Sequence, residues 1–392
     1  MDNKRIKVTE LDFDQIKINL KNYFKGQSQF SDYDFEGSGL SILLDVLAYN
    51  THYNALYANM AMNEAFLDSA AKRNSVVSHA KLIGYIPSSA KCSQAVVNLR
   101  VSSVNGNPDV LTLPAYSEFV TSIDGNSYTF YNRNAMTVGR TSSNTYLFTN
   151  IVITEGTKIR NRYINDTNTR FIIQNVGCDT STLSVQVQKN ASTSLYDVYK
   201  SAPEFSTIKP TDKVYFIKEI EDQLYEVYFG DNIIGTSIDN GNIVTLNYLI
   251  SSKEAPNNAT TFTFNSNLGG TAVVSTVSKA QGGADIESID SIKLHAPRNF
   301  SAQNRAVTAE DYKTLLPQVY PNIESINVWG GDEQIPPEFG KVYLCIKPKS
   351  ADSLSLSTKN IIKNTLIKSK NIVSITPEII DPEFLYISIQ SN

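Results

Sequence analysis

Cysteine, histidine and tryptophan are scarce in this sequence, which contains three cysteines, three histidines and one tryptophan among 392 residues. The cysteines Cys92, Cys178 and Cys345 are odd in number and far apart in the chain. Their spacing predicts neither a disulfide framework nor a zinc site. Such cysteine usage is typical of a protein that stays in a reducing compartment.

Long apolar runs and basic runs are also missing. No stretch approaches the roughly eighteen consecutive apolar residues of a membrane-spanning helix, and the segment 1–17 has no apolar core of a signal peptide. The formal net charge is −4, and the basic residues are dispersed. We therefore expect neither nucleic acid nor a membrane as a partner.

Motifs for catalysis are absent as well. The sequence contains no His-Glu-x-x-His, no Gly-x-Ser-x-Gly and no phosphate-binding glycine–lysine loop. Gly282 and Gly283 precede a predicted helix, but Asp285 and Glu287 follow at once and would repel a phosphate. We therefore predict no catalytic residue, no cofactor, no metal and no small-molecule substrate.

An apolar stretch between Phe35 and Pro87 is the most distinctive part of the chain. Large apolar side chains recur there at steps of three and four residues, which predicts a long helix with Ser38 as its N-cap. A second helix follows and ends at Gly84, so the two are expected to form a hairpin. A shorter helix is predicted before them, over Thr9 to Gly26.

Two interpretations of this helical hairpin stay open. It can be an ordinary hairpin packed on its own domain, or it can also be an assembly surface for another chain. The long helix is rich in tyrosine and asparagine, and aromatic side chains with one polar group are frequent at protein interfaces. The candidate interface residues are Leu43, Leu47, Tyr49, Tyr53, Leu56, Tyr57, Met60 and Phe66.

After Pro87 the pattern changes to short alternating strands separated by turn signals, which is typical of a β-sandwich or barrel. The last part follows the order α-β-β-α-β, which indicates a ferredoxin-like layer and includes final strands over Ile372 to Ile375 and Leu385 to Ile389. Thr308, with Asp311 three residues later, predicts the N-cap of a helix in this part. The predicted fold class is therefore α+β and multidomain: an N-terminal helical hairpin, a β-sandwich or barrel-like middle with an inserted β subdomain, and a C-terminal ferredoxin-like α+β domain.

The expected domain boundaries follow these changes of pattern, since a chain of 392 residues is too long for one core. The predicted parts are a helical assembly domain (1–90), a β-domain (91–150 with 207–282), an inserted β subdomain (151–206) and a C-terminal α+β domain (283–392). The candidate hinge residues are the glycine pairs Gly269-Gly270 and Gly282-Gly283.

Four stretches, in the same order, resemble baseplate-J-like proteins, and in particular the large inner-ring wedge subunits of T4-like contractile-tailed phages. The first is the apolar stretch itself, read from Phe35 to Ala95. Tyr225 to Gly235 (YEVYFGDNIIG) is similar to the family's FGDG-type hairpin, and Gln281 to Ala296 is similar to its GG-x-D-x-E linker. Pro297 to Lys347 contains RAVTAEDY and resembles the family's RAVT-x-x-DY domain.

This resemblance implies a structural, non-enzymatic subunit of a baseplate wedge, with roles in wedge assembly, inner-ring formation and transmission of the contraction signal to the sheath. It implies that two copies pair within each wedge and join other wedge subunits, with sheath-proximal baseplate proteins as further partners. Assembly in the host cytoplasm and a final place in the virion tail are expected. The longer wedge subunits continue beyond the end of this sequence, so both a naturally short member and a fragment stay open.

A second function stays open beside the wedge. Tyrosine, asparagine, serine and threonine are plentiful in the β-region, as they are in many carbohydrate-binding surfaces. The alternative is therefore a receptor- or glycan-binding tail protein.

Overall fold

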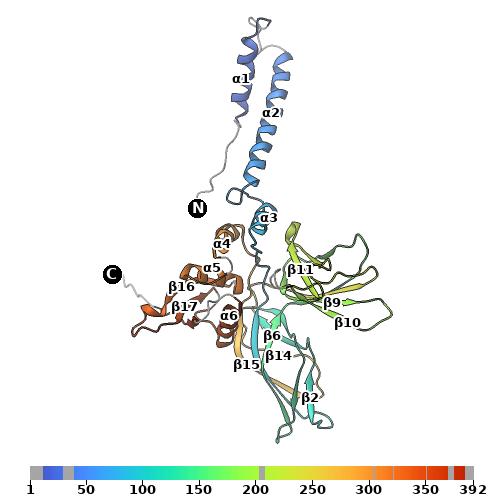
Figure 1. The fold of residues 1–392 in the computed structure, drawn as a ribbon. Helices are drawn as coiled ribbons and strands as arrows, with labels where there is room; N and C mark the ends of the chain where they lie inside the picture. The colour runs from blue at the N-terminus through green and yellow to red at the C-terminus, as the bar shows by residue number, and fades with distance from the viewer. Residues whose placement is uncertain are drawn as a thin grey trace. The chain divides into compact units, whose positions relative to one another are not determined.

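The computed structural model describes most of the chain (Figure 1), namely residues 12–29, 39–202, 208–302, 305–320, 322–349, 351–369 and 375–384. The chain divides into two compact units. One unit comprises Met1–Tyr85 with Ile289–Ala296, and the other comprises Ile86–Ser288 with Pro297–Asn392. Within the ranges given above, no helix has the length and apolar character needed to span a membrane.

The first unit contains three helices near the amino terminus, α1 (Phe13–Lys25), α2 (Gly39–Glu64) and α3 (Arg73–Leu82). The side chain of Asp12 caps α1 by accepting a hydrogen bond from the N–H of Gln15 (2.9 Å). The helices predicted from the apolar periodicity are confirmed. The predicted cap Ser38 lies outside the described residues.

Helix α2 lies alongside α1, not in a hairpin with α3 as predicted (Figure 1). Ile16 of α1 and Leu44 and Ala48 of α2 are buried, and Lys17 forms an ion pair with Asp45 across the two helices. The periodicity marks which residues of α2 are apolar, but it carries no information on which helix covers them. The predicted pairing was therefore wrong, although both helices exist.

Helix α3 packs instead against the beginning of α4 (Ile289–Ala302). The turn between α2 and α3 is fixed by Glu64, whose carboxylate accepts hydrogen bonds from the N–H groups of Ala71 (2.9 Å) and Lys72 (3.2 Å). Burial alone would raise the pKa of Glu64, but these hydrogen bonds and one from Ser75 outweigh it and lower the pKa. The buried cluster consists of Ala70, Val76, Val77, Ala80, Tyr85, Ile292 and Ala296.

The second unit begins with a six-stranded antiparallel sheet in the order β14-β3-β4-β6-β1-β15. Its core is aromatic and aliphatic, with Phe119, Phe130, Tyr146 and Phe148 fully buried. A two-stranded sheet of β2 and β5 accompanies it. The strands are β1 (Gln94–Ser102), β2 (Val110–Leu113), β3 (Glu118–Ile123), β4 (Asn126–Asn132), β5 (Met136–Gly139), β6 (Thr145–Glu155), β14 (Thr263–Phe264) and β15 (Thr271–Gln281).

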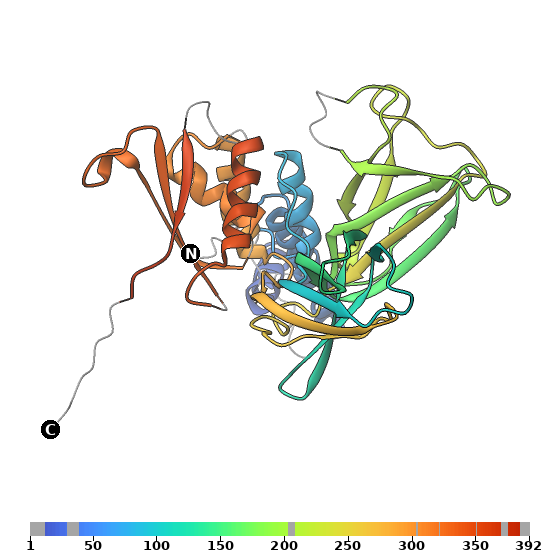
Figure 2. The same ribbon diagram turned by 90° about the horizontal axis from the view of Figure 1, so that it is seen from below.

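A seven-stranded sheet, drawn in green to yellow in Figure 2, follows in the order β7-β13-β9-β10-β11-β12-β8. Its two edge strands approach each other, since the hydroxyl of Tyr163 on β7 donates to the carbonyl of Ile172 on β8 (2.5 Å). The sheet is therefore barrel-like. Its strands are β7 (Thr157–Ile164), β8 (Phe171–Ile173), β9 (Cys178–Gln188), β10 (Tyr196–Ser201), β11 (Val214–Glu219), β12 (Tyr225–Phe229) and β13 (Ile243–Ile250), with the turn η2 (Glu221–Gln223) before β12.

The sheet boundaries differ from the predicted insertion at 151–206. Strands β11, β12 and β13, which the sequence analysis assigned to the first β-domain, pair within the seven-stranded sheet. Residues 151–155 belong to β6 of the first sheet. Alternation of apolar and polar residues shows which side chains face a core, but it does not show which sheet a strand joins.

The C-terminal part contains α5 (Ala309–Val319), β16 (Ile323–Gly330), η3 (Gly331–Glu333), β17 (Lys341–Pro348), α6 (Leu356–Ser369) and β18 (Thr376–Ile380). Strand β17 lies in the centre, antiparallel to β16 and parallel to β18, and helices drawn in orange to red lie on one side of the strands in Figure 2. The predicted capping box of Thr308 and Asp311 is confirmed at the start of α5. Most of the predicted strand over Ile372 to Ile375, and the one over Leu385 to Ile389, lie outside the described residues.

An ion-pair cluster on the seven-stranded sheet gives a pH-dependent prediction. Arg170 donates two hydrogen bonds to the carboxylate of Glu226 (2.9 and 2.8 Å), and Lys218 lies 3.0 Å from it. The hydrogen bonds from Arg170, with those from Lys218, lower the pKa of Glu226 to about 2. A lowered folded-state pKa gives a contribution to stability that is present above the unfolded-state pKa and is lost as the pH falls towards 2.

We expect Glu226→Gln to lower the free energy of unfolding by about 1–2 kcal/mol at pH 7. The loss should shrink as the pH falls below the ordinary pKa of a glutamate, since the carboxylate of the unfolded wild-type chain then binds a proton while that of the folded chain is still ionised. Urea unfolding at pH 7 and at pH 3 measures both values. Glu221→Gln, at an exposed position nearby, is the control, and equal effects of the two variants at pH 7 would contradict the assignment.

Candidate functional site

The surface of α2 exposes large apolar side chains along its length. Seven of the eight predicted interface residues are exposed, and only Leu56 is half-buried. Tyr57 keeps 62% and Leu43 keeps 58% of its surface exposed, values unusual for side chains of this size. Phe66, the last of the eight, lies just after the end of α2.

Residues that the sequence analysis missed extend this surface. Ile42, Val46 and Met62 are also exposed. Their signal was present in the sequence, because a helix that is apolar around most of its circumference is typical of one buried on more than one side. Only Leu44, Ala48, Ala55 and Asn59 of α2 are buried, so most of its apolar surface is left open in the described part of this chain.

Three tyrosines order the middle of this surface. The hydroxyl groups of Tyr49 and Tyr53 are 3.0 Å apart, and the two rings meet edge to face at 4.6 Å. The ring of Tyr57 follows at 6.2 Å from that of Tyr53. The hydrogen bond with Tyr49 raises the pKa of Tyr53. The aromatic side chains therefore hold one another in place before any partner binds, which lowers the entropy cost of association.

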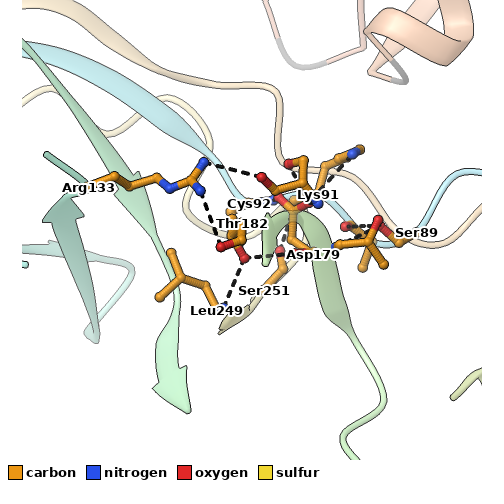
Figure 3. Close-up of polar contacts among 11 residues, drawn as sticks. Ser89, Lys91, Cys92, Arg133, Asp179, Thr182, Leu249 and Ser251 are labelled. Atoms are coloured by element: carbon orange, nitrogen blue, oxygen red, sulfur yellow. Dashed lines mark hydrogen bonds and ion pairs between the residues drawn. The ribbon is translucent and has the colours of Figure 1, made fainter. Parts of the chain in front are cut away.

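A second group of residues joins the two large sheets of the second unit (Figure 3). Asp179, at the start of β9, is 1% exposed. Its carboxylate accepts hydrogen bonds from the N–H of Cys92 (2.9 Å) and from the N–H and hydroxyl of Ser181 (2.9 and 2.6 Å). Lys91 lies 3.5 Å from the same carboxylate. Asp179 thus ties the segment that leads into β1 of the six-stranded sheet to β9 of the seven-stranded sheet.

Arg133 reinforces the junction from the other side. It follows β4 of the six-stranded sheet, and its guanidinium donates to the carbonyls of Ser181 and Thr182 (both 3.2 Å). The hydroxyl of Thr182 in turn accepts from the N–H of Leu249 on β13 (2.9 Å), as Figure 3 shows. Arg133 therefore binds the main chain of β9 close to the place where the register between β9 and β13 shifts, between Asn247 and Leu249.

The chain crosses between the sheets at two places beside this junction. The first crossing is Glu155-Gly156, and the second follows Ile250. Gly156 has a φ of +143°, and a Cβ added there would lie 2.8 Å from the carbonyl oxygen of Ile250. Only glycine fits this crossing without a shift of the main chain.

Glu155 is a second buried carboxylate at the junction, 2% exposed. Burial raises its pKa, hydrogen bonds from Ser252 lower it, and the neighbouring carboxylate of Asp179 raises it again. Burial likewise raises the pKa of the Cys92 and Cys178 thiols, so both stay protonated and unreactive at neutral pH. The junction therefore has the character of a structural polar cluster. In the part of the chain that the structure describes, no cluster of three His, Cys, Asp or Glu side chains could hold a metal ion.

The glycine pairs predicted as hinges lie in tightly packed places. Gly283 is buried between hydrogen bonds with the side chain of Asn257 at both its N–H (3.0 Å) and its carbonyl (2.9 Å). A Cβ on Gly270, just before β15, would lie 2.4 Å from the carbonyl oxygen of Ser102 at the end of β1. The hinge stays a prediction, and this close packing speaks against free rotation at either pair.

We expect Asp179→Asn to lower the free energy of unfolding by about 2–3 kcal/mol. The amide has one acceptor oxygen where the carboxylate has two, and its NH2 group would face the hydrogen-bond donors of Cys92 or Ser181. Urea unfolding monitored by tyrosine fluorescence measures the loss. Asp197→Asn is the matched control, because Asp197 pairs with Lys213 at a half-exposed site and should cost about 0.5 kcal/mol or less. Equal stability of Asp179→Asn and the wild-type chain would contradict the structural role of this carboxylate.

Comparison with known proteins relates both ends of the chain to baseplate proteins. Residues 12–85 match the family described as baseplate wedge protein gp6-like, helical domain. Residues 308–380 match the family described as baseplate structural protein gp6, C-terminal domain I. The helical match contains α1, α2 and α3, and therefore the whole exposed apolar surface.

One curated relative extends the similarity over nearly the whole chain. The baseplate wedge protein gp6 of Enterobacteria phage T4 is 30% identical over 404 residues, an alignment that covers 96% of this chain and 59% of that protein. The chain thus spans about three fifths of the length of this relative. Among solved structures, the 6-fold symmetrised cryo-EM structure of the anti-feeding prophage baseplate covers 96% of this chain and 80% of the matched chain, with 15% identity and a TM-score of 0.31.

Proposed function

We propose that this chain is a structural subunit of a contractile-tail baseplate wedge and that it resides in the virion tail after assembly in the host cytoplasm. The observation that carries the proposal is the exposed apolar surface of α2, which lies inside the segment that matches the gp6-like helical domain. The T4 wedge protein aligns with 96% of this chain at 30% identity, which supports the same role.

We propose that α2 is the surface through which the protein assembles. Two copies would pair along the eight interface residues and join other wedge subunits, with sheath-proximal baseplate proteins as further partners. A 26-residue helix that is apolar on most sides needs cover on more than the one face that α1 provides. The proposed role is structural, with inner-ring formation and transmission of contraction as its consequences.

The architecture suits a protein that transmits movement. We propose that the six-stranded sheet and the inserted seven-stranded sheet are two domains, with the insertion at about 157–250, and that they act as one strut because the Asp179 cluster joins them. We also propose that the C-terminal part is a ferredoxin-like layer, and that the finer kinship is with baseplate-J-like proteins. Tyr312, Leu315 and Ile362 of its two helices share one buried cluster with the sheet.

Immunogold labelling of intact virions tests the proposal. Antibody against this chain is expected to label the end of the tail that faces the host, and a cryo-EM map of the tail should show density for the chain inside the baseplate. Labelling of peripheral fibres, or absence of the chain from purified virions, would refute the wedge role. A glycan array with the purified chain tests the receptor- or glycan-binding alternative, for which the wedge role predicts no bound glycan.

A further inference from the structure

The loop between β16 and β17 exposes two large apolar side chains. Ile335 is 97% exposed and Phe339 is 84% exposed. Both lie in the segment 331–340, which we name the apolar loop. Among the residues that the structure describes, neither side chain belongs to a buried cluster, and exposed apolar side chains of this size are typical of a surface that binds another molecule.

The apolar loop is held in one shape by its own contacts. The carbonyl of Gly331 accepts hydrogen bonds from the N–H groups of Gln334 (3.3 Å) and Glu338 (2.7 Å). A Cβ on Gly331 would lie 1.9 Å from the carbonyl oxygen of Glu338, so only glycine permits this close approach. The carboxylate of Glu338 accepts from Tyr343 (3.0 Å) and pairs with Lys341 (2.5 Å). A loop fixed in this way loses little conformational entropy when it binds.

An apolar groove lies elsewhere in the same unit, on the outer face of the six-stranded sheet. Its volume is about 620 Å³, and the segment before α6 forms its other wall. Val152 is 44%, Val277 is 53% and Leu356 is 78% exposed. Apolar side chains of both walls, including Val96 and Leu354, line it.

The loop and the groove are complementary in charge as well as in polarity. Asp332 and Glu333 are exposed at the beginning of the apolar loop, and Lys279 lies at the groove. We propose that the apolar loop of one copy inserts Ile335 and Phe339 into the groove of a second copy of this chain. Loop and groove are different surfaces, so the contact is head-to-tail and leaves a free groove and a free loop at its ends.

This contact deepens the proposed assembly role, and it uses a surface separate from α2. Two inserted side chains make an interface well below the roughly 1,000 Å² of a stable pair, so the contact is weak by itself. The contact becomes effective when α2 already holds copies together, because it then forms within an existing complex, at a raised effective concentration. The two surfaces can therefore be tested separately.

Site-specific cross-linking of the full chain tests the proposal. Phe339→Cys and Val277→Cys are made separately in a Cys345→Ser background, since Cys345 is half-exposed whereas Cys92 and Cys178 are buried. Mild oxidation of the mixed variants is expected to give a cross-linked dimer, and each variant alone is expected to give none. Leu195→Cys, 81% exposed on another loop, replaces Phe339→Cys in the control mixture.

Two further variants examine the charge pairing. Lys279→Glu should lower the yield of the cross-linked dimer at least about threefold, as expected when like charges oppose each other. Reversal of both loop acids, Asp332→Lys with Glu333→Lys, should restore the yield. No dimer from the Phe339→Cys and Val277→Cys mixture, or an equal yield from the Leu195→Cys control, would overturn the proposal.

The same mixture also separates this contact from the α2 surface. With Tyr53→Ser and Tyr57→Ser added to both variants, a cross-link that persists at raised protein concentration supports the loop contact even if pairing through α2 is absent. If the chain pairs through α2 as the wild type does but gives no cross-link, the loop contact is refuted and the assembly role of α2 is not.

Discussion

Replacement of both Tyr53 and Tyr57 by serine is expected to abolish self-association of this chain while its β-sheets stay folded. The two rings are exposed and hold each other in an ordered row, so their loss removes area from the interface without opening a core. Buried interface tyrosines are typical hot spots, and truncation of each costs about 2 kcal/mol of binding free energy. Loss of both should therefore raise the dissociation constant of self-association by roughly a thousandfold.

Sedimentation velocity measures the association, and far-ultraviolet circular dichroism with thermal unfolding measures the fold. The matched control is Tyr196→Ser, since Tyr196 is 54% exposed on β10, which belongs to the second unit. The assembly role of α2 would be contradicted if the double variant still associates like the wild-type chain, or if it unfolds completely.

A second large effect is expected at Gly283. Gly283→Ala would place a methyl group 2.1 Å from the carbonyl oxygen of Lys253 and 2.5 Å from the hydroxyl of Ser93. The main chain must move, which breaks the hydrogen bonds between Gly283 and Asn257. We expect a loss of about 3 kcal/mol or more, and low soluble yield, because close main-chain contacts cannot relax locally.

Gly139→Ala is the control, because a Cβ at this strand position meets only one atom, at 4.0 Å. Chemical denaturation compares the two variants with the wild-type chain. A neutral Gly283→Ala, together with limited proteolysis that cuts next to Asp285, would restore the hinge predicted from the sequence. Resistance to proteolysis there, with a large loss of stability, supports a fixed crossing.

The sequence predicted the elements of this fold better than their partners. Steps of three and four apolar residues located α2, and Thr308 with Asp311 located the start of α5. Both signals are local, because they depend on side chains within one or two helical turns. The pairing of α2 with α1 rather than with α3, and of β13 with β9, depends on contacts between whole elements, which leave no comparable local trace.

The two candidate surfaces differ in the same way. The residues of α2 were found because an excess of apolar and aromatic residues is visible in the composition of one helix. Asp179 was missed, since its main partner, Cys92, lies 87 positions away. The only sequence signal for it is a carboxylate next to an apolar strand start at Cys178, and many surface residues have such a neighbour.

The chain enters the seven-stranded sheet and leaves it at one cross-strand pair of residues. Thr157, the first residue of β7, lies opposite Ile250, the last residue of β13, in the antiparallel register. The ends of the inserted segment are thus about one strand spacing apart, roughly 5 Å. A genetic exchange that replaces residues 157–250 therefore needs only a short turn to close the six-stranded sheet. We expect this position to tolerate removal or exchange of the whole module while the six-stranded sheet keeps its own core.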